Sequence, residues 1–131
     1  MTNSKLVEWV LRLGIAGEFF GHGIFALQGK AQWLGWIRQL SGVADIPASW
    51  ILFTIGALDI LVALIVLVKP FRAVLLWATV WGFWTALVRP LVGEPIWDFV
   101  ERWANWAAPL ALFFYYGRPR SLKEWFSNKL P

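Results

Sequence analysis

Four apolar stretches, each long enough to cross a membrane, occupy most of this 131-residue chain. They run approximately over residues 6–27, 47–68, 71–88 and 96–116. Because a transmembrane helix needs about 20 mostly apolar residues, this pattern predicts an all-α fold, an integral membrane four-helix bundle. The length fits a single membrane domain covering residues 1–131. The chain is 59% hydrophobic, well above the usage of an ordinary soluble domain.

Two further short helices are expected outside the crossings. In the connector between the first two stretches, residues 28–45, apolar side chains recur on one helical face: Trp33, Trp36, Ile37 and Leu40. Polar side chains fill much of the other face, so this connector predicts a helix lying in the membrane surface. After the fourth stretch, Pro119 interrupts the chain, and residues 121–128 predict a short surface helix.

The distribution of basic residues predicts the orientation. An even number of crossings places both termini on one side, together with the turn at Lys69-Pro70. That side holds seven basic residues, whereas the opposite loops hold three, Lys30, Arg38 and Arg89. By the positive-inside rule, both termini are expected in the cytoplasm of a cell with a bacterial-type cytoplasmic membrane. Membrane topology thus explains the net charge of +4, and the bilayer rather than nucleic acid is the expected partner.

Glu18 and His22 lie one helical turn apart inside the first apolar stretch, and His22 is the only histidine in the chain. A charge at the bilayer centre costs roughly 2.5–3.5 kcal/mol or more, so such groups face the bundle interior or a water-filled cavity. We predict that this pair handles protons. The alternative is a hydrogen-bonded pair that only locks helix packing. Nearby, Gly17 and Gly21 have the spacing that permits close approach of two membrane helices.

Polar residues in the other stretches fall at a similar depth. Asp59 is the only charge within the second stretch, Arg89 ends the third, and Glu101 and Arg102 lie in the outer half of the fourth. We therefore predict a ligand-binding cavity in the outer half of the bundle. Its predicted lining is Glu18, His22, Asp59, Arg89, Glu101 and Arg102, walled by Trp81 and Trp84.

Each of these residues also has a structural alternative. Asp59 could be a neutral, buried side chain that only supports packing. Arg89 could reach to the membrane surface from a helix end. Trp81 and Trp84 belong to a stripe with Trp77, and such a stripe is often helix packing.

The sequence lacks the residues that several kinds of chemistry require. The chain has no cysteine, which excludes disulfides, thiol relays and thiolate metal sites. One histidine is too few for a carboxylate-bridged di-iron site, so no metal site is expected. The glycine-rich phosphate loops, zinc-protease motif and serine-hydrolase motif of soluble enzymes are also absent from the sequence.

Arg12, the run Gly17-Glu18-Phe19-Phe20-Gly21-His22-Gly23 and Lys30 resemble the first-helix signature of the DoxX-like family. The run Gly56-Ala57-Leu58-Asp59 is similar to that family's second-helix segment. The resemblance implies four short membrane helices. Members of the family resemble quinone-linked oxidoreductase subunits, including the membrane part of thiosulfate:quinone oxidoreductase. The resemblance therefore implies a redox-associated subunit with a redox protein partner, a quinone as its ligand and no covalently bound cofactor.

In that reading Glu18 and His22 carry protons, Arg102 binds an anionic or carbonyl group, and Trp81 and Trp84 flank a ring. Two other functions remain open from the residues alone. One is a structural accessory subunit of a larger membrane complex. The other is a small transporter or channel that works as a homo-oligomer.

Overall fold

The computed structural model describes residues 1–130, and these residues form helices, turns and loops without strands. Within this range the helices are α1 (Asn3–Leu27), α2 (Ala31–Ser41), α3 (Asp45–Val68), α4 (Arg72–Leu91), α5 (Ile96–Val100), α6 (Trp103–Tyr115) and α7 (Leu122–Trp125). Three of them, α1, α3 and α4, are long and apolar enough to cross a membrane. The predicted all-helical, membrane-compatible fold is confirmed to that extent.

The fourth predicted crossing is not one continuous helix. α5 ends at Val100, α6 begins at Trp103, and Glu101 and Arg102 form a turn between them. In a continuous helix the Asp98 carbonyl would accept the N–H of Arg102. Here the Arg102 side chain donates to that carbonyl at 2.7 Å, while the Arg102 N–H bonds to Phe99 instead. The prediction of an unbroken helix over residues 96–116 was wrong because a side chain competes for this carbonyl.

Two helix ends also differ from the predicted boundaries. α4 continues through Pro90 to Leu91 instead of stopping at residue 88. A proline in the last turn removes only one hydrogen bond at an end that is already weakly held. The C-terminal surface helix is shorter than predicted, since α7 covers only Leu122–Trp125 of residues 121–128.

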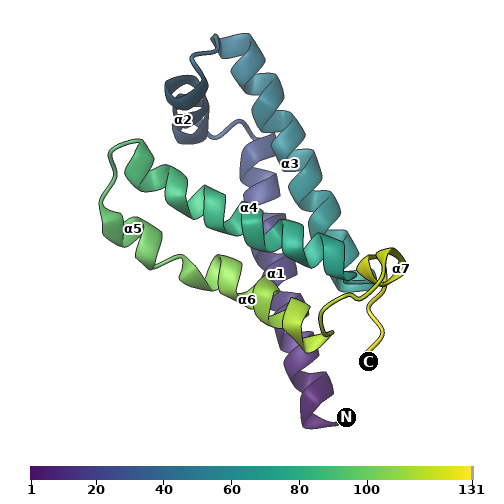
Figure 1. The fold of residues 1–131 in the computed structure, drawn as a ribbon. Helices are drawn as coiled ribbons and strands as arrows, with labels where there is room; N and C mark the ends of the chain where they lie inside the picture. Colours follow the sequence, from purple (N-terminus) through teal and green to yellow (C-terminus); the bar gives the residue numbers. More distant parts are fainter. Residues whose placement is uncertain (131) are drawn as a thin grey trace.

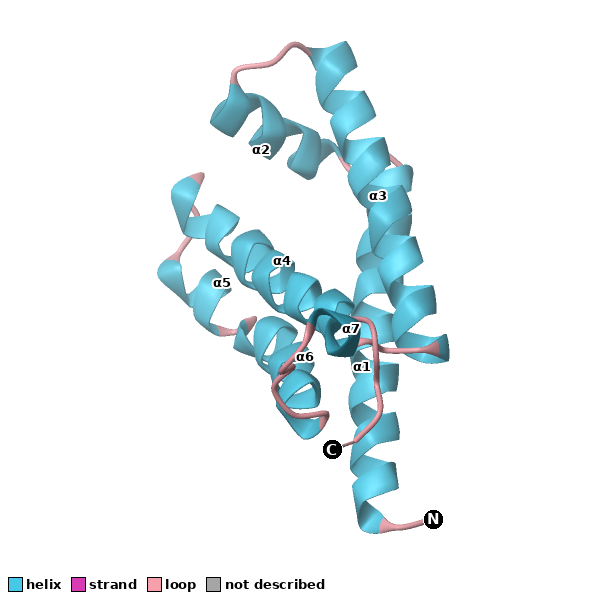
Figure 2. Ribbon diagram, turned by 45° about the vertical axis from the view of Figure 1, so that its right-hand side comes forward, coloured by secondary structure: helices cyan, strands magenta, loops and turns pink. Residues whose placement is uncertain are grey.

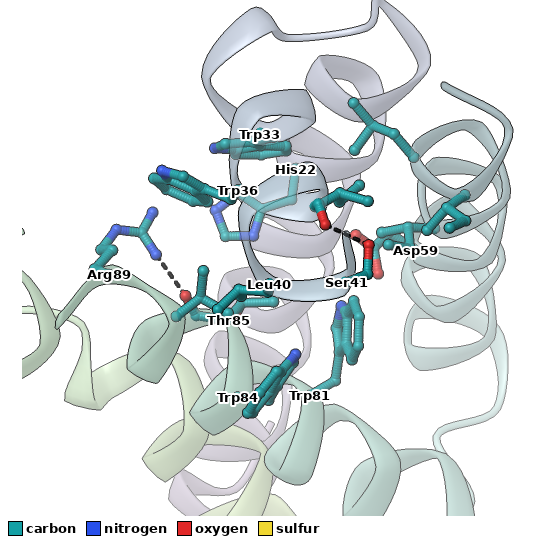
Figure 3. Close-up of a pocket in the computed structure, with 15 residues that line it drawn as sticks. His22, Trp33, Trp36, Leu40, Ser41, Asp59, Trp81, Trp84, Thr85 and Arg89 are labelled. Carbon is teal, nitrogen blue, oxygen red and sulfur yellow. Dashed lines mark hydrogen bonds between the residues drawn. The ribbon is translucent and has the colours of Figure 1, made fainter. Parts of the chain in front are cut away.

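The long helices form two pairs. α1 packs along α3, and α4 packs along α6. Figures 1 and 2 show that the pairs meet near the end of the molecule that carries both termini and diverge toward the opposite end. The short helix predicted between the first two crossings is present as α2, and it lies at this diverging end (Figure 1). Side chains of four helices line a pocket there (Figure 3).

α1 and α3 approach each other closely at Gly23 and Gly56. A Cβ atom on Gly23 would lie 2.8 Å from the Ile60 Cδ1, and one on Gly56 would lie 2.9 Å from the Gly23 carbonyl oxygen. Neither position has room for a side chain. Gly17 and Gly21 have a spacing that would also permit close approach, but no other helix of the described residues packs against them: outside their own stretch of α1, no atom lies within 4 Å of a Cβ built there.

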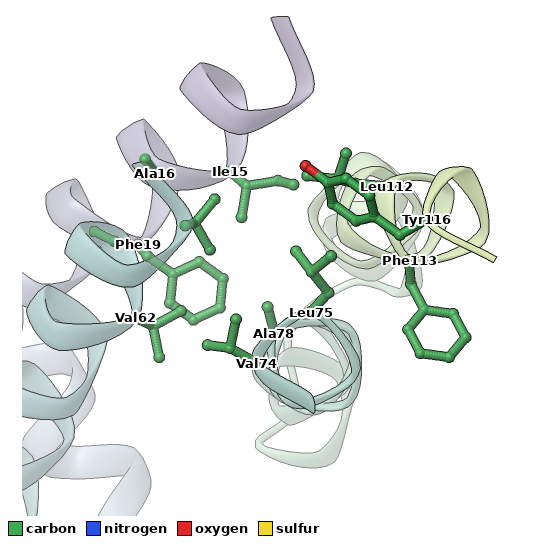
Figure 4. Packing of buried hydrophobic residues seen from close by; sticks show 12 residues of the cluster. Ile15, Ala16, Phe19, Val62, Val74, Leu75, Ala78, Leu112, Phe113 and Tyr116 are labelled. Atoms are coloured by element: carbon green, nitrogen blue, oxygen red, sulfur yellow. The ribbon is translucent and has the colours of Figure 1, made fainter. Parts of the chain in front are cut away.

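The apolar core fills the region where the two pairs meet. Ile15 and Phe19 of α1 pack there with residues from α3, α4 and the end of α6 (Figure 4). The fully buried members include Val66, Leu75, Ala78 and Leu112, each at 0% exposure. Because this core closes only one end of the molecule, the other end remains free to enclose a cavity.

Two buried arginines donate hydrogen bonds to the backbone carbonyls at the ends of other helices. Arg12 of α1 donates from Nε to the Val66 carbonyl at 3.1 Å and from Nη2 to the Leu67 carbonyl. The last carbonyls of a helix have no partner within that helix, so Arg12 satisfies the end of α3. Arg72 does the same beyond α6, donating to the carbonyls of Tyr116 and Gly117. These contacts give both arginines structural roles.

Candidate functional site

A cavity of about 280 Å³ lies among α1, α2, α3 and α4. Most of its lining side chains are apolar, and four of them are tryptophans: Trp33 and Trp36 from α2, and Trp81 and Trp84 from α4 (Figure 3). Its polar side chains are His22, Ser41, Asp59, Thr85 and Arg89. An apolar pocket with a few converging polar groups is the usual form of a small-molecule site.

Among the described residues, Asp59 is the one acid in the lining of the cavity. Its side chain projects from the middle of α3, and the residue is only 4% exposed. Figure 3 shows the indole nitrogen of Trp81 directed toward it. Within residues 1–130, no cation forms an ion pair with Asp59. A buried carboxyl group in an apolar helix is costly unless a partner satisfies it, which marks Asp59 as a candidate ligand-binding group.

His22 reaches the cavity from α1. Its ring meets the ring of Trp33 edge to face, with 5.5 Å between centroids and 85° between planes. Arg89, Arg102 and Lys30 are the cations whose charges act on its ring. No hydrogen bond joins His22 to Glu18 among the described residues, so the hydrogen-bonded pair considered from the sequence is not formed.

Glu18 lies outside the cavity lining, half-buried on α1. Its carboxyl group is nevertheless close enough to Asp59 for their charges to interact. Two nearby carboxylates repel each other in a medium of low dielectric constant. The structure therefore places Glu18 within electrostatic range of Asp59 and shows no hydrogen bond from it to His22 among the described residues.

Arg89 lines the cavity from the last turn of α4 and is only 7% exposed. Its Nη1 donates to the Thr85 carbonyl at 2.7 Å, and its guanidinium carbon lies 5.1 Å from the centre of the Trp36 ring. This placement does not fit the alternative in which Arg89 only reaches to the membrane surface. Its contact with Trp36 is also one of the few that connect α4 to α2.

α2 is held over the cavity by a small set of contacts. Besides Arg89 and Trp36, the Gln32 Nε2 donates to the Glu94 Oε1 at 2.9 Å, which joins the start of α2 to the turn after α4. Gly29 and Gly42 flank α2 with φ angles of 69° and 72°. Both angles lie in the left-handed region that favours glycine, and they let the chain turn sharply on either side of α2.

The structure places five of the predicted site residues on the cavity: His22, Asp59, Trp81, Trp84 and Arg89. It places Glu18, Glu101 and Arg102 away from the lining, so the predicted lining was wrong for these three. At the break between α5 and α6, the Arg102 side chain donates to the Asp98 carbonyl and also forms an ion pair with Glu101. The roles of all eight residues in binding or proton transfer remain predictions.

Sequence reasoning missed the contribution of α2. Trp33 and Trp36 were assigned to a helix at the membrane surface, but both line the cavity and stack with 6.4 Å between centroids. The spacing of Trp33 and Trp36 could have indicated this role, since the apolar face of an amphipathic helix usually packs against other parts of the protein. Trp77, the third member of the predicted stripe, stacks on Trp81 at 5.6 Å and is 45% exposed outside the cavity.

Among residues 1–130, no group of three or more His, Cys, Asp and Glu side chains is arranged to hold a metal ion. Comparisons of the chain with models of known protein families, with curated proteins and with solved structures find no match. The geometry of the cavity is therefore the basis for any functional assignment.

Proposed function

We propose that the chain is an integral protein of a bacterial-type cytoplasmic membrane with four crossings and both termini in the cytoplasm. α5 and α6 together form the fourth crossing, since residues 96–115 would span about 30 Å at 1.5 Å per residue. Irregular backbone at membrane depth is tolerated where other parts of the protein cover it. Two observations support this topology: both termini lie toward one end, and most basic residues belong to the same end.

Within this topology, the cavity binds the ring of a quinone or a similar amphipathic molecule from the bilayer. The observation that carries the proposal is Asp59, a residue that is only 4% exposed, has no cationic partner among the described residues and lines a tryptophan-walled cavity. Tryptophan faces accept a flat ring at the spacing of aromatic stacking. Asp59 and His22 are positioned to hydrogen bond to ring carbonyl or hydroxyl groups.

The remaining polar residues take supporting roles in this proposal. Arg89, beside Trp36 at the cavity edge, faces a carbonyl or anionic group of the ligand in place of the more distant Arg102. Glu18 exchanges protons with Asp59, and His22 exchanges them with the ligand. The chain then acts as a DoxX-like membrane subunit, and a redox protein partner exchanges electrons with the ring.

A binding titration tests the proposal. The purified chain in lipid nanodiscs is titrated with a short-chain quinone, and quenching of tryptophan fluorescence is recorded. Saturable quenching is expected, with affinity at least about tenfold weaker for Asp59→Asn because a charge-assisted hydrogen bond is worth roughly 1.5–3 kcal/mol. Trp97→Leu is the control, since Trp97 is 72% exposed and lies outside the cavity.

Two results would contradict the proposal: quenching that does not saturate, and equal affinity for the unmodified chain and Asp59→Asn. Equal affinity combined with stable co-purification of a partner protein would favour the accessory-subunit function. Flux of a solute into liposomes containing only this chain would favour the transporter.

A further inference from the structure

The segment after α6 folds back against the start of α4 and surrounds a second hollow, of about 810 Å³. Arg72, which is 4% exposed, fixes the shape of this segment. Its guanidinium donates to the backbone carbonyls of Gly117 at 2.6 Å, Ser127 at 2.8 Å and Lys129 at 2.9 Å. One buried side chain thus organises residues that are spread over the last part of the chain.

The hollow is strongly positive. Its lining includes five cations: Arg72, Arg118, Arg120, Lys123 and Lys129. Glu124 is the one acid in the lining, and its Oε2 already accepts the backbone N–H of Arg120 at 2.7 Å. Within residues 1–130, none of the five cations forms an ion pair. A concave surface with unpaired charges of one sign attracts an anion.

Exposed apolar side chains lie beside these cations. Leu122, Phe126 and Leu130 follow one another at four-residue intervals and are 79%, 59% and 55% exposed. On the other side of α7, Trp125 packs against Phe113 with 6.1 Å between ring centroids. Apolar side chains next to lysine and arginine are typical of segments that lie at a membrane surface.

The hollow also lies at the depth where lipid headgroups are expected. α3 ends at Val68 and α4 begins at Arg72, which itself lines the hollow. Figure 1 shows α7 next to this turn, where α3 ends and α4 begins, while α1 continues beyond it toward the N-terminus. In the topology proposed above, the level of this turn coincides with the headgroups of the cytoplasmic leaflet, which is negatively charged.

We infer that this hollow binds the phosphate group of an anionic lipid. Arg118, Arg120 and Lys123 surround the phosphate, while Leu122 and Phe126 lie against the acyl chains. A lipid fits better than free phosphate because a free ion makes no use of the exposed apolar side chains. The inference rests on the proposed membrane insertion but not on ring binding in the tryptophan-walled cavity.

Lipid retention measured by native mass spectrometry tests the inference. The full chain is purified in detergent with equal amounts of phosphatidylglycerol and phosphatidylcholine. We expect preferential retention of phosphatidylglycerol, and at least a tenfold loss of that preference in the double variant Arg120→Gln, Lys123→Gln. Each basic side chain near an anionic surface contributes roughly a fivefold effect.

The matched control is Lys5→Gln with Lys69→Gln, which removes the same charge from the same end of the molecule without touching the hollow. All four side chains are exposed, so both variants are expected to fold. Equal losses in the two variants would overturn the inference in favour of general surface attraction. Binding of inorganic phosphate without preference for the anionic lipid would overturn it in favour of free phosphate. The quinone titration is a separate measurement, so failure of either proposal is recognised independently.

Discussion

The hydroxyl group of Tyr116 donates a 2.6 Å hydrogen bond to the Oε1 atom of Glu8, across 108 positions of sequence. The same carboxylate oxygen lies 3.3 Å from the Arg12 Nη1, and Arg12 in turn closes the end of α3. This connection joins α1, α3 and the end of α6 at the end of the molecule opposite the cavity. Glu8 and Arg12 of α1 thus have a structural role.

Tyr116→Phe is expected to destabilise the protein by about 1–2 kcal/mol, because it removes a hydrogen bond to a charged group. Tyr116 is only 2% exposed, so the phenyl ring keeps its packing while the Glu8 carboxylate loses one donor. Thermal unfolding in detergent measures the effect. Tyr115→Phe is the matched control, since no hydrogen bond of the Tyr115 hydroxyl occurs within residues 1–130. Equal stability of the two variants would contradict the prediction.

Arg12→Met should cost more, roughly 2–4 kcal/mol, because it leaves the Val66 and Leu67 carbonyls without this donor and the Glu8 carboxylate with Tyr116 alone. Arg12→Lys should recover only part of this loss, since an ammonium group lacks the planar fork that reaches several acceptors. Hydrogen exchange at the last turn of α3 reports the change locally. An Arg12→Met variant with unchanged protection there would show that other donors satisfy these carbonyls.

A third prediction separates the two sets of glycines on α1. Gly23→Ala is expected to destabilise by about 1–3 kcal/mol, because its Cβ would meet Ile60 at 2.8 Å and the Gly56 carbonyl at 3.0 Å. Gly17→Ala should be neutral or stabilising, because its Cβ meets open space and alanine favours helix. Unfolding of the monomeric protein in detergent distinguishes them. A loss of stability at Gly17 as large as that at Gly23 would contradict the assigned packing.

The different surroundings of the α1 glycines show which part of the fold could be predicted from the sequence and which could not. The length of the apolar stretches identified α1, α3 and α4, because a membrane-crossing helix needs about 20 mostly apolar residues in a row. Spacing alone identified Gly17 and Gly21 as able to pack, but it carries no information about which helix lies opposite. The close contact at Gly23 and Gly56 depends on how two helices are aligned, and that alignment is a property of the whole fold.

In the candidate site, too, some residues could be predicted from the sequence and others could not. His22 and Asp59 stood out because ionisable groups in apolar helices are rare, and the structure places both on the cavity. Trp36 was missed because its helix was assigned to the membrane surface, whereas the apolar side of α2 lines the cavity. Arg102 was misplaced because its side chain takes a backbone carbonyl and breaks the helix, a competition that periodicity does not reveal.

The last prediction concerns access to the cavity. α2 is joined to the turn after α4 by the hydrogen bond between Gln32 and Glu94, and glycines with left-handed φ angles flank it. Glu94→Ala should therefore let α2 move away from the cavity and expose Trp36. Stronger quenching of tryptophan fluorescence by acrylamide is the expected readout. Gln39→Ala is the control, because Gln39 is exposed on α2 and its side chain makes no hydrogen bond within residues 1–130.

A cross-link provides the converse test. The chain has no native cysteine, so Gln32→Cys with Glu94→Cys introduces a single pair across the opening. A cleavable bis-maleimide cross-linker of matching length should join α2 to the turn after α4 and slow the binding of a short-chain quinone, and cleavage of the linker should restore it. If α2 is the route of entry, the rate changes while the affinity at equilibrium does not. A cross-linked protein that binds as fast as the cleaved one would show that entry of the ligand needs no movement of α2.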